Sequence, residues 1–312
     1  MISCTEFIPS YSELFSFIDE NFGGHKEVER FWQYLFEPTE EGIPLIKYAK
    51  KDGLKGCFDY WTKTLSEEAA STTRYLNEEK GFVYEIMDYC PSKGRLLQYQ
   101  KELGLVPYYD YCGHCDYYRS HLEKVGLTWI ANFVGVEKAQ CSYLIIDPKK
   151  FKGVVSIDEK TIKSQFVAEE AEYFHPDFHN SVNMGIDYLG KNYGVDNLKA
   201  YFKRFVKNYY VKTVKDAENN PLNAIANRIK DTYEAEKALD VISFDLQKDR
   251  LNVNVEYCPA IKHLKSIGST VSKYFIYSTT ALLESLAEEV GVKFKLISYD
   301  DETGKANYCF YK

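Results

Sequence analysis

The tetrapeptide Asp88-Tyr89-Cys90-Pro91 returns later in the chain as Glu256-Tyr257-Cys258-Pro259, at an offset of 168 residues. The run 251–257 alternates apolar and polar residues, which is typical of a half-buried strand, and 82–89 takes the same place before the first Cys-Pro pair. Proline is favoured in the first turn of a helix. Each tetrapeptide therefore predicts a strand that ends directly before a helix.

Further matches between the two halves keep nearly the same offset and the same order along the chain. A dipeptide often matches by chance, but ordered matches over the whole length indicate an internal repeat. We therefore predict a tandem duplication of one α+β unit with pseudo-two-fold symmetry. The alternative is one α+β domain that holds two similar local motifs. The matched segments are 7–12 with 174–179, 18–19 with 186–187, 123–126 with 288–291 and 141–143 with 309–311.

The predicted copies occupy 1–146 and 173–312, and the charged stretch 147–172 is the predicted linker. Helices grouped before strands that are joined by hairpins indicate an α+β fold, not a doubly wound parallel sheet. A turn rich in Asp and Gly at 300–304 predicts the last hairpin. The expected helices are 10–22, 25–36, 58–76 and 112–125, then 178–193, 195–210, 221–239 and 277–290; the remaining strands are 127–134, 139–146, 292–299 and 306–311.

The composition of the chain excludes several classes of function. Among 312 residues, 45% are hydrophobic and 27% are charged, which is ordinary for a globular protein. The net charge of −7 argues against a nucleic-acid partner and against attachment to an anionic membrane. Neither a long apolar run nor a secretory signal is visible, so the eight cysteines predict a cytoplasmic protein with reduced or metal-bound thiols. The 27 tyrosines fit polar-lined cavities for a small-molecule ligand, or tyrosine-rich interfaces; nothing indicates an oligomeric state.

Cys90 and Cys258 are the first candidate functional residues. A thiol at the start of a helix lies near the positive end of the helix dipole, which stabilises the thiolate. Either cysteine could then be a nucleophile or a metal ligand, with Asp88 or Glu256 as the general base. The tyrosines between each acid and cysteine, Tyr89 and Tyr257, would contact the substrate. The alternative is that each cysteine is a small buried residue needed for packing.

A Cys-x-x-Cys motif, Cys112 and Cys115, occurs only in the first copy. With Cys90 and Cys141 it could form a four-cysteine zinc site, since the predicted strands bring these two close together. The pair could instead be a redox-active dithiol, although no buried strand leads into it. Packing without chemistry is the third interpretation.

His175 and His179 occur only in the second copy. At a spacing of four they could share one helix face and bind a metal with Asp177 or a distant cysteine, or contact a polar substrate. Pro176 disfavours this geometry because the residue before a proline is usually extended. The alternative is a helix N-terminus with surface histidines.

On its two acid-Tyr-Cys-Pro segments and the last strands of the two halves, which carry Cys141 and Cys309, the chain resembles the L-2-amino-thiazoline-4-carboxylic acid hydrolase-like family. A weaker resemblance is to small-molecule-binding domains of the 4-vinyl-reductase type. The first resemblance implies a hydrolase that acts on a small cyclic or amidine-type C–N compound; in the namesake, ring opening gives N-carbamoyl-cysteine. The alternatives are a non-catalytic sensor that binds a small molecule or metal, and a thiol-disulfide oxidoreductase that uses Cys112 and Cys115.

Overall fold

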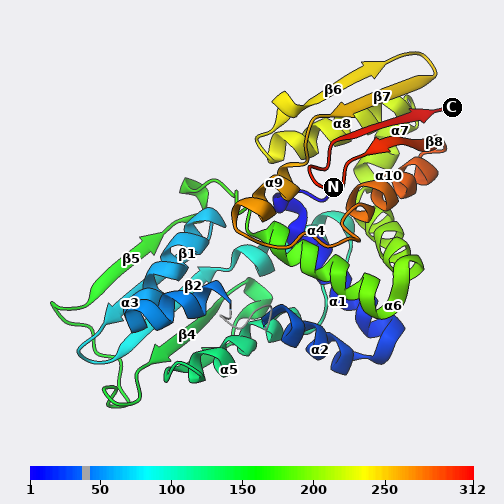
Figure 1. Cartoon of the computed structure of the whole chain (residues 1–312). Coiled ribbons are helices and arrows are strands. Elements are labelled where there is room, and N and C mark those ends of the chain that lie inside the picture. Colours follow the sequence, from blue (N-terminus) through cyan, green and yellow to red (C-terminus); the bar gives the residue numbers. More distant parts are fainter. Residues whose placement is uncertain (37–42) are drawn as a thin grey trace. The chain divides into compact units, whose positions relative to one another are not determined.

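The computed structural model describes residues 1–36 and 43–312, which divide into two compact units (Figure 1). The first, here called the continuous unit, is Ile18–His175. The second, the split unit, combines Met1–Phe17 with Pro176–Lys312. Each contains helices and one antiparallel sheet, so the predicted α+β class is confirmed.

The continuous unit is built on a five-stranded antiparallel sheet in the order β3-β4-β2-β1-β5. Alternate residues of β1 and β2 are buried beneath α3, which packs on these two strands. The α3 helix is broken at Gly53, whose φ of 59° lies in the left-handed region that favours glycine. The strands are β1 (Ser71–Asn77), β2 (Phe82–Tyr89), β3 (Thr128–Asn132), β4 (Cys141–Ile146) and β5 (Ile162–Phe166), and the helices are α2 (His25–Phe36), α3 (Pro44–Glu67), α4 (Pro91–Leu103) and α5 (Tyr118–Glu123).

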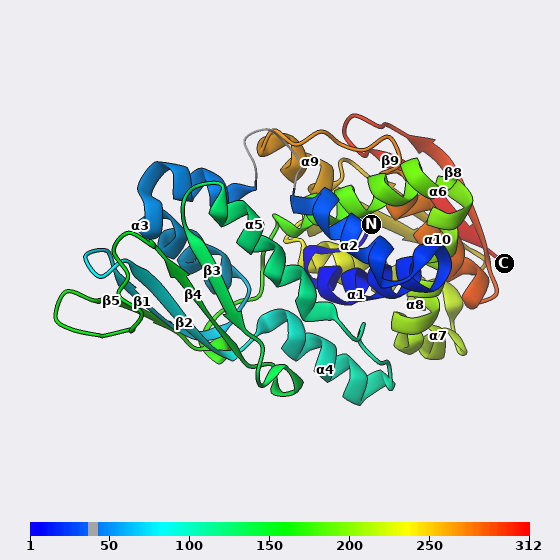
Figure 2. The same ribbon diagram turned by 90° about the horizontal axis from the view of Figure 1, so that it is seen from below.

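The split unit has a four-stranded antiparallel sheet in the order β6-β7-β9-β8. Helices α6 and α10 lie side by side in it (Figure 2), and α6 is kinked at Gly194. The strands are β6 (Ile242–Leu246), β7 (Arg250–Val255), β8 (Lys293–Tyr299) and β9 (Ala306–Tyr311), and the helices are α1 (Phe7–Ile18), α6 (Phe178–Tyr209), α7 (Val211–Ala217), α8 (Pro221–Ala235), α9 (Pro259–Ser266) and α10 (Tyr277–Glu289).

The two sheets share one topology, because β1-β2-β4-β3 and β6-β7-β9-β8 have the same order. In both units a Cys-Pro helix follows the second strand, α4 after β2 and α9 after β7. The two cysteine backbones are also held alike: Cys90 N–H donates to Ala139 O at 2.7 Å, and Cys258 N–H donates to Thr303 O at 2.8 Å. These likenesses support a duplication, which stays a prediction.

The first predicted copy and the compact units have different bounds. The segment Met1–Phe17 belongs to the split unit because its apolar side chains pack on α6. Phe7 stacks on Phe178 with ring centroids 4.2 Å apart, and the Tyr201 hydroxyl donates to Ser10 O at 2.8 Å. Within the predicted linker 147–172, residues Ile162–Phe166 form β5, the edge strand beside β1.

The first strand of each sheet was not predicted. Residues 71–76 were assigned to a helix, but α3 ends at Glu67 and β1 follows. Ala69 has a φ of 54°, which stops the helix and turns the chain into the strand. Ser-Thr-Thr at 71–73 is moreover better suited to a strand than to a helix. Strand β6 is short and half exposed, so its alternation is weak.

The strand register corrects one of the matches that predicted the duplication. Met87 pairs with Cys141 across β2 and β4. The residue that corresponds to Met87 at the offset of the Cys-Pro motifs is Val255, and it pairs with Ala306, not with Cys309. The two cysteines therefore occupy different positions in their sheets, because the connections before β4 and β9 differ in length.

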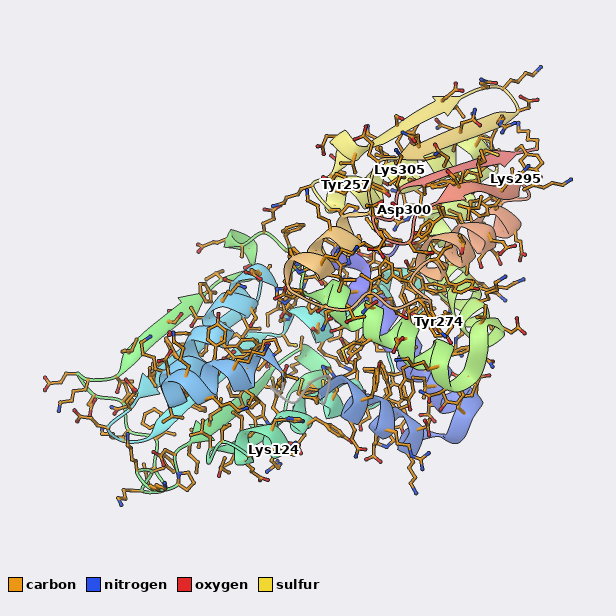
Figure 3. All side chains as sticks on the ribbon, viewed as in Figure 1. Lys124, Tyr257, Tyr274, Lys295, Asp300 and Lys305 are labelled. Atoms are coloured by element: carbon orange, nitrogen blue, oxygen red, sulfur yellow. The ribbon has the colours of Figure 1, made fainter. Side chains whose placement is uncertain are left out.

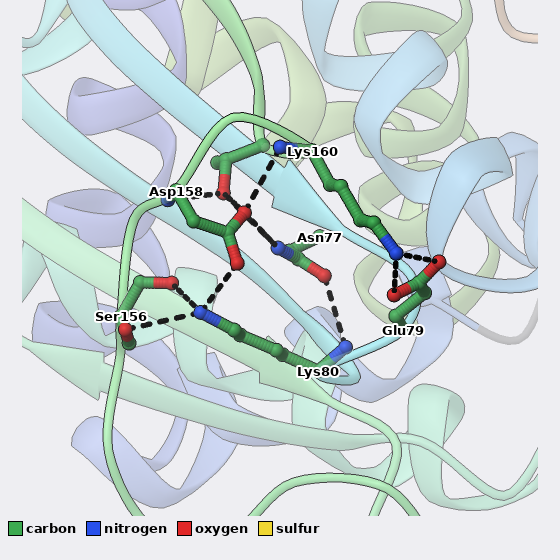
Figure 4. A network of polar contacts seen from close by, with 7 residues as sticks. Asn77, Glu79, Lys80, Ser156, Asp158 and Lys160 are labelled. Atoms are coloured by element: carbon green, nitrogen blue, oxygen red, sulfur yellow. Dashed lines mark hydrogen bonds and ion pairs between the residues drawn. The ribbon is translucent and has the colours of Figure 1, made fainter.

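A polar network holds the stretch before β5 against the β1–β2 turn (Figure 4). The Asn77 side chain is 1% exposed, donates to Asp158 at 3.1 Å and to Thr161 at 3.0 Å, and accepts from Lys80 N–H at 2.9 Å. At the rim, the exposed Lys160 pairs with Glu79 at 2.8 Å. The buried amide, rather than the exposed ion pair, is thus the anchor of this segment.

Replacement of Asn77 by alanine should lower the free energy of unfolding by about 2 kcal/mol, because buried partners lose their hydrogen bonds. Urea unfolding measures this change. The matched control Lys160→Ala removes only a solvent-exposed pair and should leave the unfolding midpoint nearly unchanged. Equal effects of the two substitutions would contradict the assignment of Asn77 as the anchor.

Candidate metal centre

Three side chains with metal-ligand chemistry meet inside the split unit: Cys4, His179 and Glu236. One donor atom from each lies within 4.8 Å of the other two. Cys4 begins the short 3-10 turn before α1, His179 is in the first turn of α6, and Glu236 caps the C-terminus of α8. Their exposed fractions are 0%, 1% and 7%, so the cluster is shielded from bulk solvent.

The Glu236 carboxylate organises this cluster. One oxygen, Oε1, accepts from the backbone N–H of Cys4 at 2.6 Å, and Oε2 is 2.9 Å from Nε2 of His179. Burial by itself would raise the pKa of Glu236, but the hydrogen bonds from His179 and Cys4 outweigh it and lower the pKa below its ordinary value. The carboxylate is therefore ionised in a buried position, which suits a metal ligand.

The second nitrogen of His179 is also buried. In the described part of the chain, Nδ1 has no hydrogen-bond partner. A buried polar atom without a partner costs about 1–3 kcal/mol, so most such atoms in proteins are paired. A metal ion bound by the ring would fix its tautomer and offset that cost.

A second group of contacts holds the segment that carries Cys4. Glu6, two residues on, pairs with Arg228 of α8. The Arg228 guanidinium lies over the ring of Tyr210, 4.3 Å from its centroid. The donor groups of the cluster are thus positioned by neighbouring helices, which is what a preformed site requires.

The Cys-Pro cysteine of the split unit borders the cluster. Cys258 is 4% exposed, and its Sγ contacts the Sδ of Met1 at 3.3 Å. Burial is the main cause of its raised pKa, and the Glu236 charge adds to it. On the same helix, His263 binds Asp177 at 2.8 Å and lies near His179, with ring centroids 6.3 Å apart.

The predicted general base of this half differs from the thiol in burial. Glu256 is exposed, and its backbone N–H binds Val241 O at 2.9 Å. The Tyr257 hydroxyl accepts from Lys262 at 3.1 Å, at the end of the sheet where the β8–β9 turn carries Asp300 and Lys305 (Figure 3). Burial raises the pKa of the Cys258 thiol, which disfavours the thiolate that a nucleophile needs.

The equivalent residues of the continuous unit give a similar picture. Cys90 caps α4, and its Sγ accepts from Lys93 N–H at 3.5 Å, yet burial raises its pKa to about 12. The helix dipole therefore does not overcome desolvation here. Asp88 is exposed. Tyr89 packs over Gly94, where an added Cβ would lie 2.2 Å from the Tyr89 ring.

The four cysteines of the predicted zinc site gather in one neighbourhood. Cys90 and Cys141 pack on the same small hydrophobic cluster, which contains Met87. The four thiols are close enough to affect one another: Cys90 and Cys141 both raise the pKa of Cys115, and Cys112 raises the pKa of Cys141. Among the described residues, however, they do not form a group whose donor atoms all lie within 4.8 Å. Burial raises the pKa of both Cys112 and Cys115, which disfavours the thiolate that a redox pair needs.

The two histidines of the predicted pair go to different places. His179 lies in the cluster with Cys4 and Glu236. His175 precedes α6, which begins at Phe178, and its Nδ1 lies 2.6 Å from Glu67 in the continuous unit. The two therefore do not share one helix face, because Pro176 keeps His175 out of the helix.

Sequence reasoning missed Cys4 and Glu236, although one signal for the glutamate was present. Thr232 and Glu236 repeat Thr64 and Glu68 at the offset of the Cys-Pro motifs. All four side chains are buried at the ends of α8 and α3. The repeated threonine and glutamate could therefore have been recognised in the sequence as a further match between the two halves.

Comparisons with known proteins assign the chain to no family. No protein-family model matches the chain, and neither a curated protein nor a solved structure matches it significantly. The resemblance to the amino-thiazoline-carboxylate hydrolases therefore stays a prediction. In the described residues no helix is long and apolar enough to cross a lipid bilayer.

Glu68, the counterpart of Glu236, has the opposite electrostatics. Burial raises its pKa from 4.5 to about 7, against the lowering effect of His175 and Arg95. A folded-state pKa above the unfolded value means that the native state holds a proton that the unfolded state has lost. The contribution of Glu68 to the free energy of unfolding is therefore fully present below pH 4.5 and is lost as the pH rises through about 7.

Glu68→Gln should make the protein more stable than the wild type at pH 8, while the two should differ much less at pH 5. The rise in the pKa of Glu68 from 4.5 to about 7 corresponds to about 3 kcal/mol in the free energy of unfolding. Urea unfolding at the two pH values measures it. A stability difference that does not change with pH would contradict the raised pKa.

Proposed function

We propose that this protein binds a divalent transition metal ion at Cys4, His179 and Glu236. The observation that carries the proposal is the meeting of a thiol, an imidazole and an ionised carboxylate within 4.8 Å in a buried site. Exposed acidic groups often cluster without a metal, but these three are buried and come from segments far apart in the sequence.

The donor set favours zinc. Zinc accepts cysteine sulfur, histidine nitrogen and carboxylate oxygen together, usually in tetrahedral geometry. Magnesium and calcium require oxygen ligands and would not use the cysteine and the histidine. Three protein ligands leave one position for water or another ligand, as in zinc sites that do chemistry.

The metal would link the segment before α1 to the start of α6 and the end of α8. Binding free energy at such a site is also folding free energy, because the unfolded chain does not hold the ligands together. A metal-dependent, metal-sensing or metal-stabilised module follows most directly from this arrangement. When bound, the ion would supply Lewis acidity, and the chain's own residues would hold it and exclude solvent.

The hydrolase predicted from the resemblance remains a second candidate. Cys258 borders the metal centre, which is the one observation that connects the Cys-Pro motif to it. The nearby cavity lined by Ile2, Phe7, Tyr11 and Ile186 has a volume of only about 10 Å³, close to that of one water molecule. This cavity is too small for a ring substrate, so it adds no support for the hydrolase.

Zinc titration into the metal-free protein tests the proposal. The wild type should bind about one equivalent tightly at this site and gain about 2.7 kcal/mol of stability when free zinc is a hundredfold above the dissociation constant. Cys4→Ala/His179→Gln should lose that equivalent, because two of three ligands are removed. Calorimetric titration and thermal unfolding provide the readouts.

Two matched variants serve as controls. Cys112→Ala/Cys115→Ala removes cysteines outside the centre, and His175→Gln removes the other histidine of the pair; both should keep the equivalent. Retention of full zinc binding by Cys4→Ala/His179→Gln, with loss in the Cys112/Cys115 variant, would move the site to the four cysteines and overturn the proposal.

A further inference from the structure

A row of polar side chains crosses the buried face of the sheet in the continuous unit. Arg74 on β1 pairs with Glu85 on β2, and Glu85 pairs with Tyr143 on β4. Arg74 and Glu85 are both 0% exposed. A fully buried arginine is rare in proteins unless it is well paired.

Glu85 does not satisfy the arginine. Its Oε1 accepts from the Thr72 hydroxyl at 2.8 Å, and its Oε2 accepts from the Tyr143 hydroxyl. Arg74 Nε lies 3.3 Å from Oε2 but is not aligned for a hydrogen bond. Within the described chain, Nε and both terminal nitrogens of Arg74 have no hydrogen-bond partner.

Further unpartnered donors surround the same row. The indole nitrogens of Trp61 and Trp129 are buried without a hydrogen-bond partner among the described residues. Both indole rings pack on Tyr143, with ring centroids 5.9 Å and 4.4 Å away respectively. Every unsatisfied atom in this group is an N–H donor, so the missing partner is a hydrogen-bond acceptor.

The fold itself does not require these charges. In the split unit, the row at the same place in the sheet is Phe244, Val253 and Tyr308, since Val253 lies at the offset of Glu85 and pairs with both others. Apolar side chains of this kind commonly replace a buried ion pair without loss of stability. Burial of the Arg74 charge costs free energy, and the four-stranded sheet of the split unit has no arginine at this place. We therefore infer that Arg74 has a role in binding.

We propose that Arg74 is the anchor of a buried site for the oxyanion of a small ligand, a carboxylate or a phosphate ester. The planar guanidinium presents parallel N–H groups that match two oxygens of such a group. The ring centroids of Phe58 and Phe166 lie 6.0 Å and 5.5 Å from the guanidinium carbon of Arg74. The two tryptophans add indole N–H donors and apolar surface. The ligand would thus combine an anionic head with an apolar or aromatic body.

The electrostatics of Glu85 agree with this assignment. Burial raises its pKa, against the lowering effects of Arg74, Tyr143 and Thr72. Protonation of Glu85 would leave the positive charge of Arg74 uncompensated and strengthen its attraction for an anion. The site is separate from the metal centre, because every residue in it belongs to the continuous unit.

The test uses the full-length chain and two variants. Arg74→Phe/Glu85→Val copies the apolar row of the sister sheet and should fold at least as stably as the wild type. Arg74→Lys keeps the charge but loses the paired geometry. Sodium benzoate and inorganic phosphate are the probes, with sodium chloride at matched ionic strength as the reference, and calorimetric titration and thermal unfolding as readouts.

We expect benzoate or phosphate to bind the wild type and raise its unfolding temperature above the chloride reference. Binding should weaken about tenfold or more in Arg74→Lys and be lost in the folded double variant. The preferred probe identifies the head group as carboxylate or phosphate. Failure of both probes to bind the wild type, or equal binding by the folded double variant, would overturn the proposal.

Discussion

The buried carboxylate of Glu236 is the interaction on which the split unit depends. A charge out of water must be paired, and this one is paired with the Cys4 backbone and the His179 ring. These two bonds hold the segment before α1 and the start of α6 against the end of α8. The same two bonds bring a thiol and an imidazole to the carboxylate, so the packing of the unit and the proposed metal centre have one origin.

The equivalent carboxyl in the continuous unit shows how the surroundings decide the chemistry. Glu68 caps α3 as Glu236 caps α8, but the hydrogen bonds that lower the pKa of Glu236 have no counterpart strong enough to offset burial. One carboxyl is therefore ionised at neutral pH, and the other is partly protonated. Where the continuous unit has Arg74 and Glu85, the sheet of the split unit has Phe244 and Val253. The two units thus differ in the polar groups that they bury at corresponding positions.

Local patterns in the sequence predicted much of the fold. Strand β2 and helix α2 have the predicted bounds, 82–89 and 25–36, because alternation and helical spacing act over a few residues. Helix α3 and strand β1 were merged into one helix, since the left-handed turn at Ala69 is made by a residue that carries no turn signal.

The sites were harder to predict than the fold. Cys4 and Glu236 are 232 residues apart and belong to no motif, so only the tertiary structure brings them together. The same holds for Arg74, which looks like an ordinary strand residue until its burial is known. The Cys-x-x-Cys motif can be recognised in the sequence because its two cysteines are close together in the chain. Those cysteines do not belong to the cluster of Cys4, His179 and Glu236.

A crystal of the zinc-loaded protein, measured on both sides of the zinc absorption edge, tests the central claim most directly. We expect an anomalous peak bounded by Cys4 Sγ, a ring nitrogen of His179 and an oxygen of Glu236. A loaded crystal with its zinc peak elsewhere, and the His179–Glu236 hydrogen bond intact, would show that this cluster is only a packing contact.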